Sequence, residues 1–171
     1  MKTTVIALAF LGALAAATPS LAQTSVADQQ ALMRDLDRLM RNPQKPKQEL
    51  HLALKGCHAE QIIRDRDADV EMAKPLAVSY GGSNSGWSMS MDKGFFELKM
   101  AFEWADVTSM TYALEKDEDE DEPRHYQIKI TKRKKTSNVS FEIPLYTTNE
   151  ATVKDVMRRL EKVRQSCGSR N

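Results

Sequence analysis

The pattern with the most specific chemistry is Trp87, Met89 and Met91, which alternate with two serines. Alternate residues of a strand share one face, so an indole and two thioethers would lie together, and soft thioether sulfur binds monovalent copper. The same alternation is typical of a core strand, in which methionine fills irregular gaps. The three residues are therefore candidates for a copper site, although we favour the core interpretation and predict no metal.

Motifs of known catalytic mechanism are absent from the sequence. The three histidines, His51, His58 and His125, show no paired metal-ligand spacing, and there is no nucleophile elbow, phosphate-binding loop or dinucleotide fingerprint. His58 follows Cys57, but neighbouring residues of an extended chain point to opposite faces, so it is badly placed to take the thiol proton. We predict no catalytic residue, no cofactor and no enzyme activity.

Two runs of charge lie between predicted strands. Residues 117–122 are all acidic, and Lys132, Arg133, Lys134 and Lys135 are consecutive basic residues. Solvated loops that keep the chain soluble would explain both runs. The basic run would also suit an anionic partner, so its four residues are the candidate anion-binding or partner-binding residues.

The overall charge excludes a bulk nucleic-acid binder. The chain has 171 residues, with 25 basic and 24 acidic side chains and 41% hydrophobic residues, which is typical of an ordinary globular sequence. Lys2 is the one charged residue before Gln23, so a chain that begins there carries equal numbers of both charges. A polyanion binder needs a basic excess.

The first 22 residues predict a secretory signal peptide. Lys2 precedes an apolar run over residues 5–17, and Ser20-Leu21-Ala22 supplies the small residues of a cleavage site. The run is shorter than the roughly 20 residues that a membrane span needs. We expect cleavage after Ala22 and a periplasmic or secreted protein that does not span a membrane.

Two cysteines, Cys57 and Cys167, remain after this cleavage. An exported chain meets an oxidising environment, in which an even number of cysteines usually indicates pairing. We predict a Cys57–Cys167 disulfide. Two free buried thiols are the alternative, because spacing in the sequence does not establish proximity.

Amphipathic helices are predicted near both ends of the mature chain. One begins near Ser25, with its apolar positions running to Met40, and residues 43–48 form a linker. The other follows Glu150, which has capping-box spacing from Thr147, and carries Cys167 on its apolar stripe.

Alternating apolar residues predict six or seven strands between these helices. The clearest has Phe96, Leu98, Met100, Phe102 and Trp104 at alternate positions. The others lie around residues 50–63, 76–80, 87–91, 107–114, 126–130 and 139–145. Gly56 is expected to form a bulge within the first of these.

From about residue 95 to 166, the order of features resembles the pleckstrin-homology-like folds of bacterial proteins. A strand runs into Phe102-Glu103-Trp104-Ala105-Asp106-Val107, further strands follow, and an amphipathic helix ends the region. The resemblance implies an α+β fold in which a bent antiparallel sheet or partly open barrel carries the last helix on one side. We divide the chain into a signal peptide (1–22), an N-terminal helix and linker (23–48) and the domain itself (49–171).

In such families the usual role is the binding of lipids, peptides or proteins, so we expect an exported, non-catalytic interaction module. One alternative is a soft-metal carrier that uses Met89 and Met91, similar to the methionine-pair sites of small periplasmic copper-carrying β-barrels. Another is a carrier of a small hydrophobic ligand held inside the sheet. Asn138-Val139-Ser140 also fits a glycosylation acceptor, which would matter in a eukaryotic secretory pathway.

Overall fold

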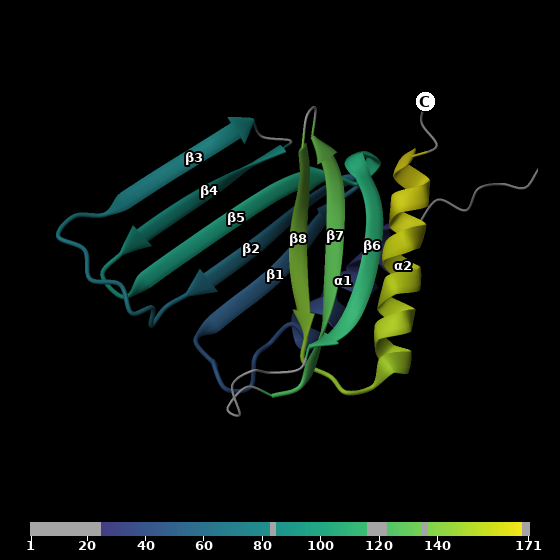
Figure 1. The fold of residues 1–171 in the computed structure, drawn as a ribbon, viewed down its shortest axis with the longest axis horizontal. Coiled ribbons are helices and arrows are strands. Elements are labelled where there is room, and N and C mark those ends of the chain that lie inside the picture. Colours follow the sequence, from purple (N-terminus) through teal and green to yellow (C-terminus); the bar gives the residue numbers. More distant parts are fainter. Residues whose placement is uncertain (1–24, 83–84, 116–122, 135–136, 169–171) are drawn as a thin grey trace, which may run out of the picture.

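The computed structural model describes residues 25–82, 85–115, 123–134 and 137–168, so the predicted signal peptide lies outside the described residues. The chain forms a helix, eight strands in two antiparallel sheets and a C-terminal helix (Figure 1). In chain order the elements are α1 (Val26–Leu39), β1 (Gln48–Lys55), β2 (His58–Asp65), β3 (Leu76–Gly82), β4 (Ser85–Asp92), β5 (Phe95–Glu103), the short 3-10 helix η1 (Trp104–Asp106), β6 (Val107–Glu115), β7 (His125–Lys134), β8 (Ser137–Leu145) and α2 (Glu150–Gly168).

The two sheets differ in size. The larger has five strands in the order β1-β2-β5-β4-β3, and the smaller has three in the order β6-β7-β8. The α+β class predicted from the sequence is confirmed, and the sheets do not close into a barrel. Figure 1 shows β3 and β4 extending beyond the region where the two sheets overlap.

A tight hairpin accounts for the eighth strand. Lys55 pairs with His58, which leaves Gly56 and Cys57 as the two turn residues, and Gly56 has a φ of 63°. A glycine at the first position of a two-residue turn reverses the chain with the twist that antiparallel strands need. The prediction of a bulge at Gly56 is therefore wrong, because the glycine ends one strand and starts its partner.

The core lies between the overlapping parts of the sheets. Phe102 of the larger sheet stacks on Phe141 of the smaller one, with ring centroids 4.9 Å apart, and meets the edge of Trp104 at 5.4 Å. All three aromatic side chains are buried. Burial of such large rings supplies much of the driving force that holds the two layers together.

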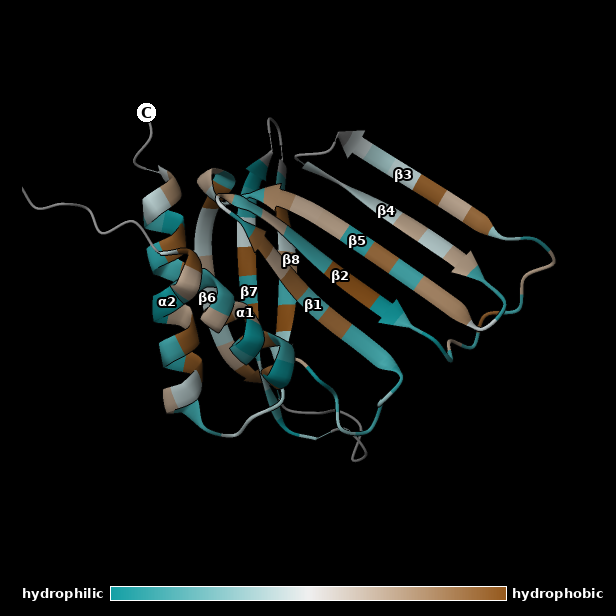
Figure 2. Ribbon diagram, turned by 180° about the vertical axis from the view of Figure 1, so that it is seen from behind, coloured by the Kyte–Doolittle hydropathy of each residue, from teal (hydrophilic) through white to brown (hydrophobic). Residues whose placement is uncertain are grey.

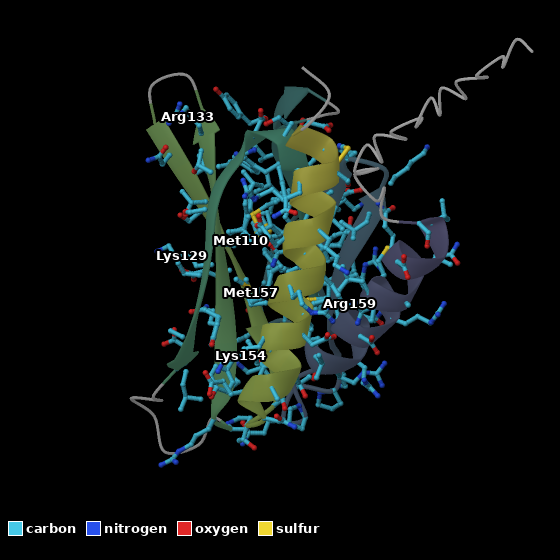
Figure 3. The ribbon with its side chains drawn as sticks, turned by 90° about the vertical axis from the view of Figure 1, so that its right-hand side faces the viewer. Met110, Lys129, Arg133, Lys154, Met157 and Arg159 are labelled. Atoms are coloured by element: carbon cyan, nitrogen blue, oxygen red, sulfur yellow. A yellow bond between two sulfur atoms is a disulfide. The ribbon has the colours of Figure 1, made fainter. Side chains whose placement is uncertain are left out.

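Helix α2 closes the space beside β6, and its Met157 lies near Met110 of that strand (Figure 3). The helix buries one stripe at helical spacing, consisting of Val153, Val156, Leu160, Val163 and Cys167. Its first turn is capped by the Asn149 carboxamide, which accepts a hydrogen bond from the Ala151 amide at 3.0 Å. The predicted Thr147 capping box is wrong, because Glu150 is already the first helical residue.

Helix α1 begins as predicted at Ser25, whose hydroxyl oxygen accepts a hydrogen bond from the Asp28 amide. Its buried residues Leu32 and Leu36 face the core, and Asp35 accepts a hydrogen bond from Arg159 of α2 at 2.7 Å. The two helices are thereby linked by both packing and charge.

The predicted disulfide is confirmed. Cys57 and Cys167 are bonded, with their Cα atoms 5.5 Å apart. The bond joins the β1–β2 turn to the last turn of α2, across 110 residues of sequence. Cys57 is therefore not available as a nucleophile.

Candidate functional site

Three adjacent strands carry an apolar face that no other described layer covers, except at Met100, which packs against the core. Strands β3, β4 and β5 pair in register, so their alternate residues line up in three rows across the sheet. The rows are Leu76, Met91 and Phe96; Val78, Met89 and Leu98; and Tyr80, Trp87 and Met100. We call the three strands the wing and these nine residues the wing face.

The opposite side of the wing has a different composition. Within the same rows its residues are Ala77, Ser79, Ser88, Ser90, Glu97 and Lys99, which alternate with the wing-face residues along each strand. Phe95, which pairs with Asp92 at the end of this side, is its one large apolar residue among these strands. Figure 2 shows this alternation as bands of contrasting hydropathy along the strands. The wing is therefore an amphipathic sheet with one apolar and one polar side.

The wing face continues the core of the protein outward. In the overlapping part of the same sheet, this side carries Leu52, Ala59 and Phe102, which are buried beneath the smaller sheet. Beyond the overlap, Leu76 is 38% exposed, Val78 40%, Tyr80 59% and Trp87 40%. Large apolar side chains that are both contiguous and exposed mark binding surfaces in soluble proteins.

The wing face ends at Lys132, near the corner where the two sheets meet. The Lys132 ammonium donates hydrogen bonds to the Ser85 hydroxyl at 3.0 Å and to the Ala101 carbonyl oxygen at 3.4 Å. It also lies 5.1 Å from the centroid of the Phe141 ring, and the residue is only 5% exposed. Lys132 thus ties β7 to the inner end of the wing.

This position corrects the interpretation of the basic run. Lys132 belongs to β7 and is buried, so it is not part of an exposed loop. Arg133 is exposed and lies with Lys129 on the outer side of the smaller sheet (Figure 3). The Lys134 side chain, Lys135 and the acidic run at 117–122 lie outside the described residues.

A glutamine links the other edge of the smaller sheet to the larger sheet. The Gln61 amide nitrogen donates a hydrogen bond to the Glu142 carbonyl oxygen of β8 at 2.9 Å. Gln61 is 1% exposed, and its side-chain oxygen has no hydrogen-bond partner among the described residues. A buried amide is costly to desolvate unless it is hydrogen-bonded, and the one bond that Gln61 makes holds β8 against the larger sheet.

The copper candidates lie together as the alternation predicted. Met89 and Met91 share the wing face with Trp87, but this face is partly exposed and does not form the predicted core strand. Their cross-strand neighbours are apolar: Val78 and Leu98 flank Met89. Within the described ranges there is also no group of three or more His, Cys, Asp or Glu residues suited to a metal ion.

The three histidines are separate from one another and from the wing face. The Nδ1 atoms of His51 and His58 lie 3.0 Å from carboxylate oxygens of Asp37 and Glu103, and that of His125 lies 3.1 Å from the Pro123 carbonyl oxygen. Each of these contacts is made to a carboxylate or carbonyl oxygen, and the first two join different elements of the fold. The arrangement supports structural roles for them.

Charged residues on the polar side of the larger sheet are engaged with one another. Arg64 donates two hydrogen bonds to Glu97, at 2.8 and 2.5 Å, and the Lys99 ammonium lies 3.1 Å from the same carboxylate. The hydrogen bonds from Arg64 hold the pKa of Glu97 below its usual value, against the opposing effect of burial, and Lys99 lowers it further. This network stabilises the polar side.

The described surface also has shallow grooves away from the wing face. One of about 360 Å³ runs between α1 and β1, where Met33 and Leu52 form part of its wall. Another of about 200 Å³ lies over the polar side of the wing, beside Ser79, Ser88 and Lys99. The first groove is also lined by Asp37 and by the His51 ring that contacts it, but no serine, threonine or cysteine is among its described lining residues. The wing face remains the most distinctive surface.

Comparison with known proteins gives no assignment: no family model matches the chain, and searches of curated proteins and of solved structures return no significant match. In the part of the chain that the structure describes, neither helix has the length and apolar character needed to cross a membrane. The geometry of the chain itself is therefore the basis for a function.

Proposed function

We propose that this protein is an exported, non-catalytic binding module that holds the acyl chain of a lipid, or a hydrophobic ligand of similar size, on its wing face. The observation that carries the proposal is the uninterrupted set of nine apolar side chains on one side of three strands. Four of these side chains are 38 to 59% exposed. They are exposed even though the other side of the same strands carries polar residues that could have faced the solvent instead.

The size of the wing face favours a small ligand. Three strands about 4.8 Å apart and three rows about 6.7 Å apart give an apolar area of about 300 Å². A stable protein–protein interface buries about 800 Å² on each partner, so the wing face alone is too small for one. An acyl chain or a comparably small apolar group matches the available area.

The chemistry of the wing face favours a flexible, uncharged ligand. Its nine residues contain no charge and include three methionines, Met89, Met91 and Met100, whose unbranched thioethers adapt to ligands of different shape. Trp87 and Tyr80 add large aromatic surfaces for apolar contact. A copper carrier is less favoured because the two neighbours of Met89 in adjacent strands carry only hydrocarbon side chains.

The proposed export is supported by the chain's covalent structure. The Cys57–Cys167 disulfide fits an oxidising compartment outside the cytoplasm. The signal-peptide pattern in residues 1–22 supports the same location. In such a compartment, a protein that shields an acyl chain from water would make that chain transportable.

The proposal is tested by titrating purified protein with dansyl-labelled undecanoic acid and displacing this probe with palmitate. Met89 occupies the centre of the wing face, so Met89→Lys places a charge where the acyl chain would lie. We expect this variant to bind the probe at least tenfold more weakly, because the ligand would have to bury or displace the ammonium.

Ser90→Lys is the matched control, because it adds the same charge to the next residue of β4, on the polar side of the wing, where its cross-strand neighbours are Ala77 and Glu97. It should bind as the wild type does, and circular dichroism should show both variants folded. Absence of probe binding by the wild type, or equal losses in the two variants, would refute the proposed function.

A further inference from the structure

We infer that a second copy of this chain pairs with β3 through its free edge, in antiparallel register about a twofold axis, and joins two five-stranded sheets into one of ten strands. The inference goes beyond the proposed function, because it uses the backbone edge of the wing, whereas ligand binding uses the wing face. Of the four sheet edges in the described fold, three are protected from pairing with another strand, and the edge at β3 is not.

The edge at β1 is covered by helix α1. The Leu54 backbone amide donates a hydrogen bond to the Met33 sulfur at 3.2 Å, and the His51 ring lies 3.0 Å from Asp37 of the same helix. A backbone amide bonded to a helix side chain is not available to a strand from another molecule.

The edges of the smaller sheet are also protected. Helix α2 lies beside β6, where the Tyr112 hydroxyl donates a hydrogen bond to Glu150 at 2.9 Å (Figure 1). On β8, Gln61 occupies the Glu142 carbonyl oxygen and Pro144 provides no amide hydrogen. Proline and capped carbonyl groups are common devices that prevent pairing at an edge strand.

Among the described residues, none of these protections is present at strand β3. It pairs with β4 on one side only, and residues 76–80 are all exposed. Its seven residues, Leu-Ala-Val-Ser-Tyr-Gly-Gly, include no charge and no proline. An exposed, uncharged edge strand of this length is a template for a further strand.

The β3 sequence is suited to pairing with its own copy. In an antiparallel pair centred on Ser79, Val78 of each copy lies opposite Tyr80 of the other, which gives two equivalent pairs. Pairs of an aromatic and a β-branched residue are favourable across strands. No like charges meet across the axis, because β3 has none. Since the other described edges are protected, pairing stops at a closed dimer.

The dimer also has a consequence for ligand binding. Residues paired across strands lie on the same side of a sheet, so the two wing faces become neighbours on one surface of the ten-stranded sheet. The junction between the two β3 strands carries, from each copy, the exposed side chains of Leu76, Val78 and Tyr80. The combined apolar area is about 600 Å², twice that of a single wing face.

Analytical ultracentrifugation of the disulfide-intact protein tests this inference. We expect a dimer for the wild type and a monomer for Ser79→Lys, because the substitution places two ammonium groups opposite each other at the axis. Ser90→Lys, one strand further in on the same polar side and opposite Glu97, should remain a dimer. A monomeric wild type, or a dimer that persists in Ser79→Lys, would overturn the inference.

Cysteine crosslinking tests the register. Ser79→Cys should give a disulfide-linked dimer on mild oxidation, since a residue on the axis lies opposite its own copy within disulfide range. Ala77→Cys should not, because its copy lies about 13 Å further along the strand. Equal crosslinking of the two variants would show that β3 does not pair in this register.

The two proposals fail independently. Ser79→Lys should lose the dimer and keep measurable binding of the dansyl probe, whereas Met89→Lys should keep the dimer and lose the probe. If instead Met89→Lys is a monomer and Ser79→Lys is still a dimer, edge pairing is contradicted. The two copies would then contact each other through their wing faces.

Discussion

Individual side chains decide where the two sheets meet. Lys132 of the smaller sheet binds a hydroxyl and a main-chain carbonyl of the larger sheet, and Gln61 of the larger sheet binds a main-chain carbonyl of the smaller one. Both side chains are almost fully buried. Such polar contacts constrain geometry more than they add stability, because a buried hydrogen bond has a net value of only about 1 kcal/mol. They fix the extent of overlap and thus how much of the larger sheet stays uncovered.

Residue-level prediction from the sequence was uneven. The disulfide was predictable because two independent signs agreed, namely the export signal and the position of Cys167 on an apolar stripe. Lys132 was misplaced because four consecutive basic residues are typical of a solvated loop. The alternation of Tyr126, Ile128 and Ile130 continues to Lys132, and following it would have put this side chain inside.

Glu97 gives a pH-dependent prediction at the residue scale. Its pKa is lowered in the folded protein, so its interactions stabilise the fold fully above the unfolded-state pKa and are lost as pH falls through the folded-state pKa. Glu97→Gln should therefore reduce the free energy of unfolding at pH 7.

Urea unfolding at a series of pH values measures this difference. The difference in free energy of unfolding between wild type and Glu97→Gln should become smaller as the pH falls below 4.5, the ordinary pKa of glutamate. A gap that stays constant down to pH 2.5 would show that the loss arises from packing and not from the carboxylate charge.

Secondary-structure elements were predicted well in kind and less well at their ends. Both helices and the alternating strands are present, because their periodicity reflects which side is buried. The eighth strand was missed at Gly56, where a two-residue turn and a bulge have the same sequence signature. The start of α2 was misplaced for a similar reason, since Asn149 competes with Thr147 as the cap.

The disulfide gives a prediction at the scale of elements. It closes a loop of 110 residues between the β1–β2 turn and α2, for which the chain-entropy model gives about 4 to 5 kcal/mol. Reduction should lower the melting temperature by on the order of 10 °C in a domain of this size.

Differential scanning calorimetry with and without a reductant measures this effect. The Cys57→Ser, Cys167→Ser double variant should melt at the temperature of the reduced protein and should not respond to the reductant. An unchanged melting temperature for the reduced wild type would show that the packing of α2 alone holds this end of the molecule.

At the scale of the whole molecule, the important feature is a mismatch between a sheet of five strands and one of three. The sequence indicates which residues share a face, because alternation fixes this locally. It does not indicate whether a second layer covers that face, because coverage depends on long-range contacts such as Gln61 to Glu142 and Lys132 to Ser85. The wing face could thus be predicted as apolar but not as exposed.

The central claim is that a hydrophobic ligand covers the wing face, and the fluorescence of Trp87 tests it most directly. The chain has two tryptophans: Trp87 is 40% exposed on the wing face, and Trp104 is fully buried in the core. Saturation with palmitate should shift the emission of the wild type to shorter wavelength, because the ligand removes water from Trp87. Trp87→Phe retains only Trp104 and should show no shift. A wild-type spectrum that does not change while palmitate displaces the dansyl probe, or a shift that persists in Trp87→Phe, would contradict binding at the wing face.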